Sequence, residues 1–117
     1  DEAHEYHRQL VELGVYVQFD RVGHGKYAVD KCARQIARLT EAGFAKQVLV
    51  GHDWAPYFYR GRFDPQVPND TIDAWTFMDG DSTIGTKQLL PQLAAAGVSA
   101  ADIHAITIDN PARVLAF

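Results

Sequence analysis

The chain has 117 residues, of which 47% are hydrophobic and 22% charged, and its net charge is −4. These values are typical of one globular domain with a modest core, and they argue against disorder. No apolar run is long enough to span a bilayer, and no signal-peptide pattern is present, so neither a membrane partner nor export is expected. The basic residues are dispersed, which argues against nucleic acid as a partner. The single cysteine, Cys32, excludes an internal disulfide and fits a reducing compartment, so we expect a cytoplasmic protein.

The first predicted element is a helix from Glu2 to Leu13. Its apolar residues recur every three or four positions, and Gly14 is expected to end it in a left-handed cap. His4 and His7 have the spacing of metal ligands, but no Glu or Cys accompanies them in a metalloprotease-like pattern, and we interpret both as solvated. Because the helical pattern has already begun at Asp1, without an initiator methionine, we expect a longer protein.

A first strand is predicted from Val15 to Asp20, where β-branched and aromatic residues end in a carboxylate. The loop after it places Arg21 and His24 on the same side as that carboxylate. The loop also contains Gly23 and Gly25, but it matches neither a P-loop nor a dinucleotide-binding pattern. We interpret both glycines as turn residues.

The order of helix, glycine and strand then repeats. A second helix is predicted from Tyr27 to Ala42, ending at Gly43, and a second strand from Phe44 to Val50. Gly14 and Gly43 are 29 residues apart, which is about the length of one αβ unit. The sequence therefore predicts an α/β fold in which the two strands are parallel.

The second strand runs into Gly51-His52-Asp53, and Asp53 has two explanations. Aspartates at strand ends commonly start turns and cap helices. The C-terminal ends of strands are also where α/β folds keep their chemistry. The strand alone leaves both explanations open.

From Trp54 to Ile84 the regular pattern disappears, and we expect a long loop without a sheet of its own. Loops of this length are usually functional or disordered, and the aromatic content argues against disorder. The aromatic side chains either pack on the rim of the fold or line a substrate pocket, and both roles stay open. They are Trp54, Tyr57, Phe58, Tyr59, Phe63, Trp75 and Phe77.

Three further helices are predicted toward the end of the chain. The first runs from Thr86 to Ala96, with a bend at Pro91. A short helix to about Ile106 is expected to begin at the cap residue Ser99. Asn110-Pro111 is expected to cap a last helix, 112–117. His104 is interpreted as a surface residue.

Three stretches together resemble the last third of the phosphotriesterase family, which includes the phosphotriesterase-like lactonases and belongs to the amidohydrolase superfamily. The stretches are Val17 to Arg21, Val48 to Asp53, and Ala96 to Ser99 followed by Asn110 to Arg113. The resemblance implies the C-terminal portion of a (β/α)₈ TIM barrel, with the two strands as its seventh and eighth. Residues 1–117 would then be a partial barrel domain of a metal-dependent hydrolase.

The resemblance also implies a site at the ends of these strands. Asp53 matches the metal-binding aspartate of the eighth strand, which accepts the proton from a metal-activated hydroxide. Two divalent metal ions are implied, zinc first, with manganese, cobalt or iron as alternatives, and a carboxylate suits all of them. The implied substrate is a small-molecule lactone, ester or phosphotriester, and the full-length form is expected to be a homodimer.

Arg21 falls where phosphotriesterases proper carry a histidine and lactonase-like members an arginine, and His52 also matches the lactonase-like pattern. Arg21 would orient a lactone carbonyl or a leaving carboxylate. His24, Trp54 and Tyr57 are predicted to line the substrate pocket. The alternative is an ion pair of Arg21 with Asp20 and a solvated His24.

The remaining metal ligands of the family, a His-x-His pair, a bridging lysine and two further histidines, have no counterpart in this sequence. A barrel of this class needs about 250 residues, so we expect hydrolysis from the full-length enzyme and an inactive isolated chain. The alternative is a non-catalytic barrel fragment, a binding or structural module whose Asp53 only forms a turn. Two strands taken out of a closed barrel would also leave unpaired edges and uncovered barrel-facing side chains, so the isolated chain is expected to be unstable or aggregation-prone. Those side chains are expected to be Val15, Val17, Phe19, Val48 and Val50.

Overall fold

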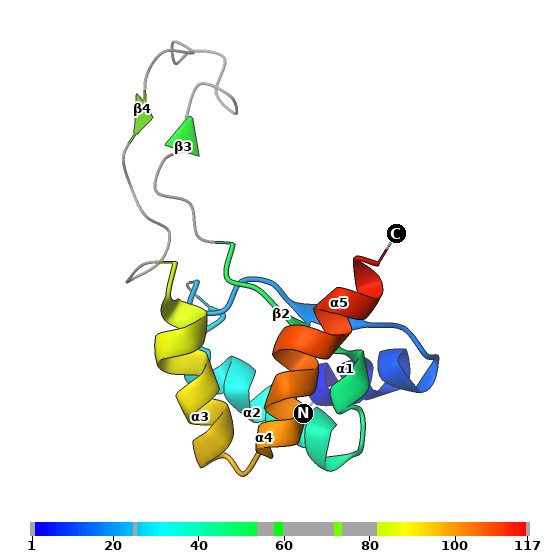
Figure 1. Ribbon diagram of the computed structural model, residues 1–117. Coiled ribbons are helices and arrows are strands. Elements are labelled where there is room, and N and C mark those ends of the chain that lie inside the picture. The colour runs from blue at the N-terminus through cyan, green and yellow to red at the C-terminus, as the bar shows by residue number, and fades with distance from the viewer. Residues whose placement is uncertain (1, 25, 54–57, 60–71, 74–81, 117) are drawn as a thin grey trace.

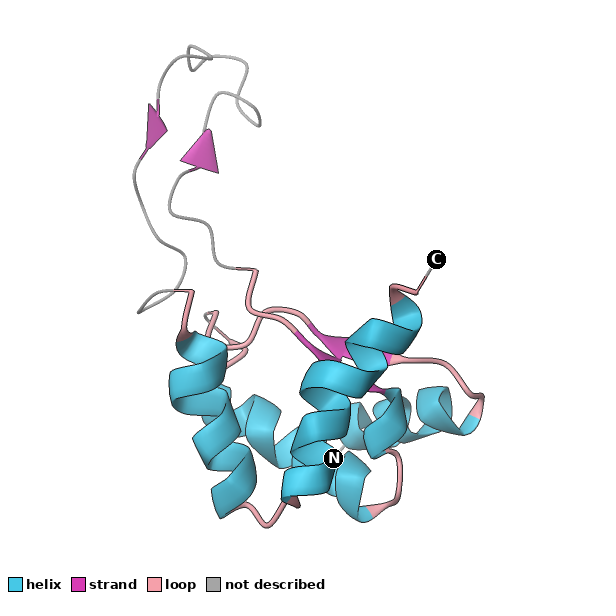
Figure 2. Ribbon diagram, in the orientation of Figure 1, coloured by secondary structure: helices cyan, strands magenta, loops and turns pink. Residues whose placement is uncertain are grey.

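The computed structural model describes residues 2–24, 26–53, 58–59, 72–73 and 82–116. Figure 1 shows helices gathered around a pair of short strands, and Figure 2 shows the same view by secondary structure. None of the helices in the described ranges is long and apolar enough to cross a membrane. In chain order the α-helices are α1 (Glu2–Glu12), α2 (Val29–Glu41), α3 (Leu90–Ala95), α4 (Ala100–His104) and α5 (Asn110–Val114). The strands are β1 (Val17–Phe19), β2 (Val48–Val50), β3 (Phe58–Tyr59) and β4 (Ile72–Asp73).

The strands β1 and β2 pair in parallel, which confirms the prediction. Val17 lies opposite Val48, and Phe19 lies opposite Val50. The ladder continues past the strands, because the backbone N–H of Gly51 donates to the carbonyl of Phe19 at 2.7 Å. Both strands therefore end at the same edge.

The two helices before these strands end as expected in glycines with left-handed backbones. Gly14 has φ +84° and Gly43 has φ +89°, a conformation that costs glycine little. The strand predicted from Phe44 begins later, because a 3₁₀ turn, η1 (Ala45–Gln47), replaces its first half. The side chain of Gln47 donates from Nε2 to the carbonyl of Val11 at 2.6 Å, which ties this turn to the end of α1.

The long stretch after Asp53 does contain a small sheet, which the sequence analysis did not predict. The strands β3 and β4 pair antiparallel, with Phe58 opposite Asp73 and Tyr59 opposite Ile72. Aromatic and β-branched residues favour such extended pairs. The expectation of a loop without its own sheet is therefore wrong.

The helices cover one face of the strand pair. Val17, Phe19 and Val48 are buried, whereas Gln18 between the first two is exposed, as the alternation of side chains along a strand requires. The expectation that Val17, Phe19 and Val48 would lack neighbours is therefore wrong, because they face the helix layer. The fully buried core residues around them include Val11, Ile36, Leu39, Leu89, Leu93 and Ile106.

The prolines of the last helices follow unusually wide turns. In η3 (Gly85–Leu89) the N–H of Leu90 bonds back five residues to Gly85, and in η4 (Ala105–Asp109) that of Asn110 bonds to Ala105. A proline ring clashes with the carbonyl four residues earlier in a regular helix. A π-type turn changes this spacing, so the helix continues through Pro91 and Pro111.

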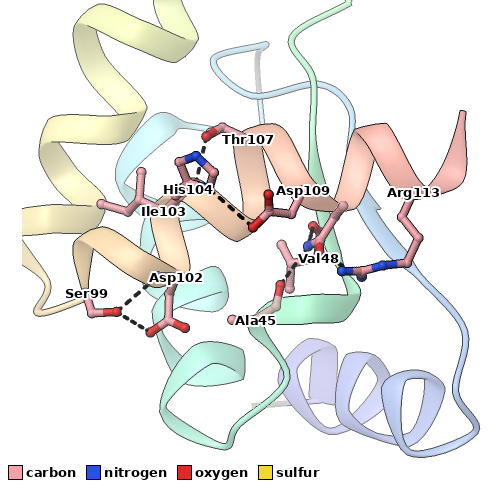
Figure 3. Close-up of polar contacts among 10 residues, drawn as sticks. Ala45, Val48, Ser99, Asp102, Ile103, His104, Thr107, Asp109 and Arg113 are labelled. Atoms are coloured by element: carbon pink, nitrogen blue, oxygen red, sulfur yellow. Dashed lines mark hydrogen bonds and ion pairs between the residues drawn. The ribbon is translucent and has the colours of Figure 1, made fainter. Parts of the chain in front are cut away.

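As a consequence, the two short helices predicted near the C-terminus form one continuous helical run through α4, η4 and α5. Ser99 caps its start as predicted, since its Oγ accepts from the N–H of Asp102 at 3.1 Å (Figure 3). The prediction that Asn110 caps a separate last helix is wrong. Asn110 has a helical backbone, with φ −67° and ψ −49°, and is 0% exposed.

The buried amide of Asn110 ties this helical run to β2. Its Nδ2 donates to the carbonyls of Ala45 and Val48, both at 2.8 Å, and these two residues are labelled in Figure 3. Its Oδ1 accepts from Arg113 at 3.4 Å. One side chain thus satisfies two backbone carbonyls at the entry to the strand, where buried polar groups need partners.

Replacing Asn110 by Ala should lower the free energy of unfolding of the full-length protein by about 2 to 4 kcal/mol, because two carbonyls lose their donor. Urea unfolding measures this change. Asp109→Ala is the matched control, since Asp109 is the exposed neighbour, and it should cost about 0.5 kcal/mol or less. Equal effects of the two substitutions would contradict the role assigned to Asn110.

Candidate functional site

The parallel pair brings Arg21 and Asp53 together at its carboxyl edge. Arg21 follows β1 and Asp53 follows β2, and the Nε of Arg21 lies 3.4 Å from Oδ2 of Asp53. Their side chains are 51% and 60% exposed. The sequence alternative paired Arg21 with Asp20, whereas the ion pair found here joins it to Asp53.

The loop after β1 is closed by its own backbone. The N–H of His24 donates to the carbonyl of Arg21 at 3.0 Å, and the N–H of Gly23 donates to that of Tyr27 at 2.8 Å. Val22, next to Arg21, is 1% exposed and belongs to the core. The backbone of Arg21 is therefore fixed, while its side chain reaches solvent.

Asp53 sits in a left-handed backbone conformation, with φ +48°. Aspartate and asparagine tolerate this conformation better than most residues. The backbone of Asp53 thus forms a turn while its carboxylate stays exposed at the strand edge. The two explanations of Asp53 from the sequence are compatible.

The structure describes only some of the other predicted pocket residues. His24 and His52 are both half-buried next to this edge of the sheet. Trp54 and Tyr57 lie outside the described residues, so their predicted role in the pocket stays a prediction.

A cavity of about 120 Å³ adjoins Arg21 between α1, β1 and α2. Its lining is mostly polar or aromatic and comprises His7, Gln18, Phe19, Asp20, Arg21, Tyr27, Cys32 and Gln35. Burial raises the pKa of the Cys32 thiol, so this side chain is kept protonated rather than as a nucleophilic thiolate.

His7 is part of this cavity wall, and its interpretation as a solvated histidine is wrong. Its ring packs edge-on against Phe19 at a centroid distance of 5.1 Å. Burial lowers the pKa of His7 below its ordinary value, and nearby His4 lowers it further. The sequence contained a signal, because His7 lies four residues before the buried Val11 and so shares its helix face.

Among the described residues, no group of three or more His, Cys, Asp or Glu side chains is arranged to hold a metal ion. The exposed carboxylate of Asp53 fits one ligand of a hard divalent ion at the strand edge. The described residues therefore do not form a complete metal site by themselves.

Comparison with known proteins places this α/β unit in a family. The sequence model of the Phosphotriesterase family matches residues 1–115. The chain therefore belongs to the phosphotriesterase family, as the resemblance predicted.

Individual relatives agree with this assignment. The chain is 29% identical over 113 residues to a phospho-furanose lactonase of Mycoplasmopsis synoviae (strain 53). This match covers 96% of this chain and 30% of that protein. The fold of this chain matches the crystal structure of an amidohydrolase from Mycoplasma synoviae with a TM-score of 0.71 and 26% identity. That match covers 97% of this chain and 30% of the amidohydrolase chain. The fold also matches the phosphotriesterase from Mycobacterium tuberculosis, with a TM-score of 0.70, 23% identity, and coverage of 94% and 32%. The chain spans about a third of the length of these relatives.

The loop that carries Arg21 depends on Gly23. This residue has φ +88°, and a Cβ there would lie 2.0 Å from Cδ1 of Ile84, which is itself 3% exposed. Gly14 has a similar φ of +84°, but a Cβ there would meet nothing within 4 Å. Both glycines therefore need a backbone with positive φ, but only Gly23 also lacks space for a Cβ.

Gly23→Ala should lower the free energy of unfolding by about 2 to 4 kcal/mol, because it combines backbone strain with overpacking. Gly14→Ala is the matched control and should cost about 1 to 2 kcal/mol. The double variant Gly23→Ala/Ile84→Val should be less destabilised than the sum of its single changes, since valine lacks Cδ1. Urea unfolding of the full-length variants checks this, and strictly additive effects would show that the contact with Ile84 is unimportant.

Proposed function

We propose that the full-length protein is a metal-dependent hydrolase of lactones or related esters, including phosphotriesters. The observation that carries this proposal is the exposed carboxylate of Asp53 at the carboxyl edge of β2, facing Arg21 from β1 at 3.4 Å. Membership of the phosphotriesterase family supports the hydrolase class. The relative named a phospho-furanose lactonase supports lactones as the substrate class. We further propose a cytoplasmic homodimer.

In this proposal Asp53 is one ligand of a centre of two divalent ions, zinc first, whose other ligands lie outside the described residues. When bound, the metal supplies an acidified water molecule as the nucleophile. The carboxylate of Asp53 would accept a proton at this edge of the sheet. Its exposure leaves the carboxylate accessible to both solvent and substrate.

The neighbours of Asp53 would bind the substrate. The fork of donors on Arg21 would orient a lactone carbonyl or a leaving carboxylate, because a guanidinium can donate two parallel hydrogen bonds to such groups. His24, Trp54 and Tyr57 would line the pocket around the rest of the substrate.

A second candidate is a non-catalytic binding or structural module. The observation that favours it is the left-handed backbone of Asp53, since a turn at this position explains an aspartate without any metal. The two candidates differ in what the carboxylate does. A substitution that keeps the turn and removes the carboxylate therefore separates them.

Asp53→Asn is that substitution, because asparagine also tolerates the left-handed region. In the full-length protein we expect at least about ten-fold weaker zinc binding and about 10²-fold slower lactone hydrolysis, as both a ligand and a proton acceptor are lost. Metal analysis and a lactone-hydrolysis assay measure the two effects.

Asp30→Asn is the control, since Asp30 is an exposed carboxylate on α2 that is also paired with an arginine, Arg34. It should leave zinc content and rate unchanged. If Asp53→Asn also leaves both unchanged, the second candidate is correct and the hydrolase site is not at Asp53.

A further inference from the structure

We propose that Arg21 is a placeholder cation that competes with the metal ion for Asp53. The guanidinium would occupy the carboxylate in the metal-free protein and release it when metal binds. Arg21 would thereby weaken metal binding, and in the metal-free protein it would neutralise the negative charge of Asp53. This inference rests on the proposed function, since it takes Asp53 to be a ligand.

The first support is the geometry of the pair. The contact of 3.4 Å joins the single Nε of Arg21 to one oxygen of Asp53, and more than half of each side chain is exposed. Water screens such a pair, and ion pairs of this kind contribute little to stability. A divalent ion that coordinates the carboxylate can therefore displace the guanidinium at small cost.

The second support is that Arg21 cannot move far from Asp53. Its backbone is held by the hydrogen bond from His24 and by the burial of Val22 next to it. Displacement must then occur by rotation of the side chain alone. The positive charge of Arg21 therefore stays near this edge of the sheet when metal binds, and like charges weaken each other's binding.

The third support is an alternative place for the guanidinium. Arg21 lines the cavity of about 120 Å³ together with Asp20, Gln18 and Gln35. The carboxylate and the two amides provide hydrogen-bond acceptors for a guanidinium. The displaced guanidinium therefore has hydrogen-bond acceptors within reach at this edge of the sheet, and it does not need to stay in open solvent.

The test is zinc titration into the metal-stripped full-length protein. Arg21→Met keeps a long side chain and removes the charge, so it should bind zinc about two- to five-fold more tightly at low salt. The difference from the wild type should shrink at about 1 M salt, where screening acts over about 3 Å. Arg21→Lys keeps the charge and should remain close to the wild type.

Arg34→Met is the matched control. Arg34 is exposed on α2 and paired with Asp30 at 2.7 Å, so its substitution changes the net charge equally and leaves Asp53 untouched. It should not alter zinc affinity. Arg21→Gln provides a second neutral variant if Arg21→Met does not fold, as judged by circular dichroism.

The outcomes separate this inference from the proposed function. Zinc binding by Arg21→Met and Arg21→Gln that is equal to or weaker than that of the wild type overturns the placeholder role. If Asp53→Asn weakens zinc binding in the same assay, the proposed function then stands alone. If Asp53→Asn binds zinc as tightly as the wild type, both proposals fail. In the Asp53→Asn background, neutralising Arg21 should have no further effect beyond that of Arg34→Met.

Discussion

The structure depends on the parallel pairing of β1 with β2. Each strand has only three residues, and the register that sets Val17 opposite Val48 also makes the strands end at one edge. Arg21 and Asp53, far apart in the sequence, meet there because of that register. A slip of one residue would turn Val17 and Phe19 away from the helices and expose them, so burial of these side chains fixes the register and with it the site.

So short a strand pair needs support from elsewhere in the chain. The amide of Asn110 holds the two carbonyls at the entry to β2, and Gln47 ties the same region to α1. The wide turn before Pro111 contributes to this support, because it lets the last helix continue through the proline with Asn110 inside it. The wide turn before Pro111 and the buried amide of Asn110 thus act together to hold β2, the strand that Asp53 follows.

Local sequence signals predicted the features that local chemistry controls. Gly14 and Gly43 marked the helix ends, and their spacing predicted the parallel strands that place Asp53 at the edge. Features set by tertiary contacts were not predicted. The sequence Asn110-Pro111 is typical of a helix start, and only the fold shows that the Asn110 amide binds two buried carbonyls instead. The ion-pair partner of Arg21 depends on how two strand ends that are distant in the sequence meet. The turn at Ala45–Gln47 likewise depends on the contact of Gln47 with α1.

The most direct test of the account is a crystal structure of the full-length protein grown with zinc, with the metal located by anomalous scattering. The account predicts a zinc ion about 2.0 to 2.2 Å from a carboxylate oxygen of Asp53, with the guanidinium of Arg21 turned away from that oxygen. A zinc-loaded structure in which Asp53 keeps its ion pair with Arg21 and has no metal at ligand distance would contradict it.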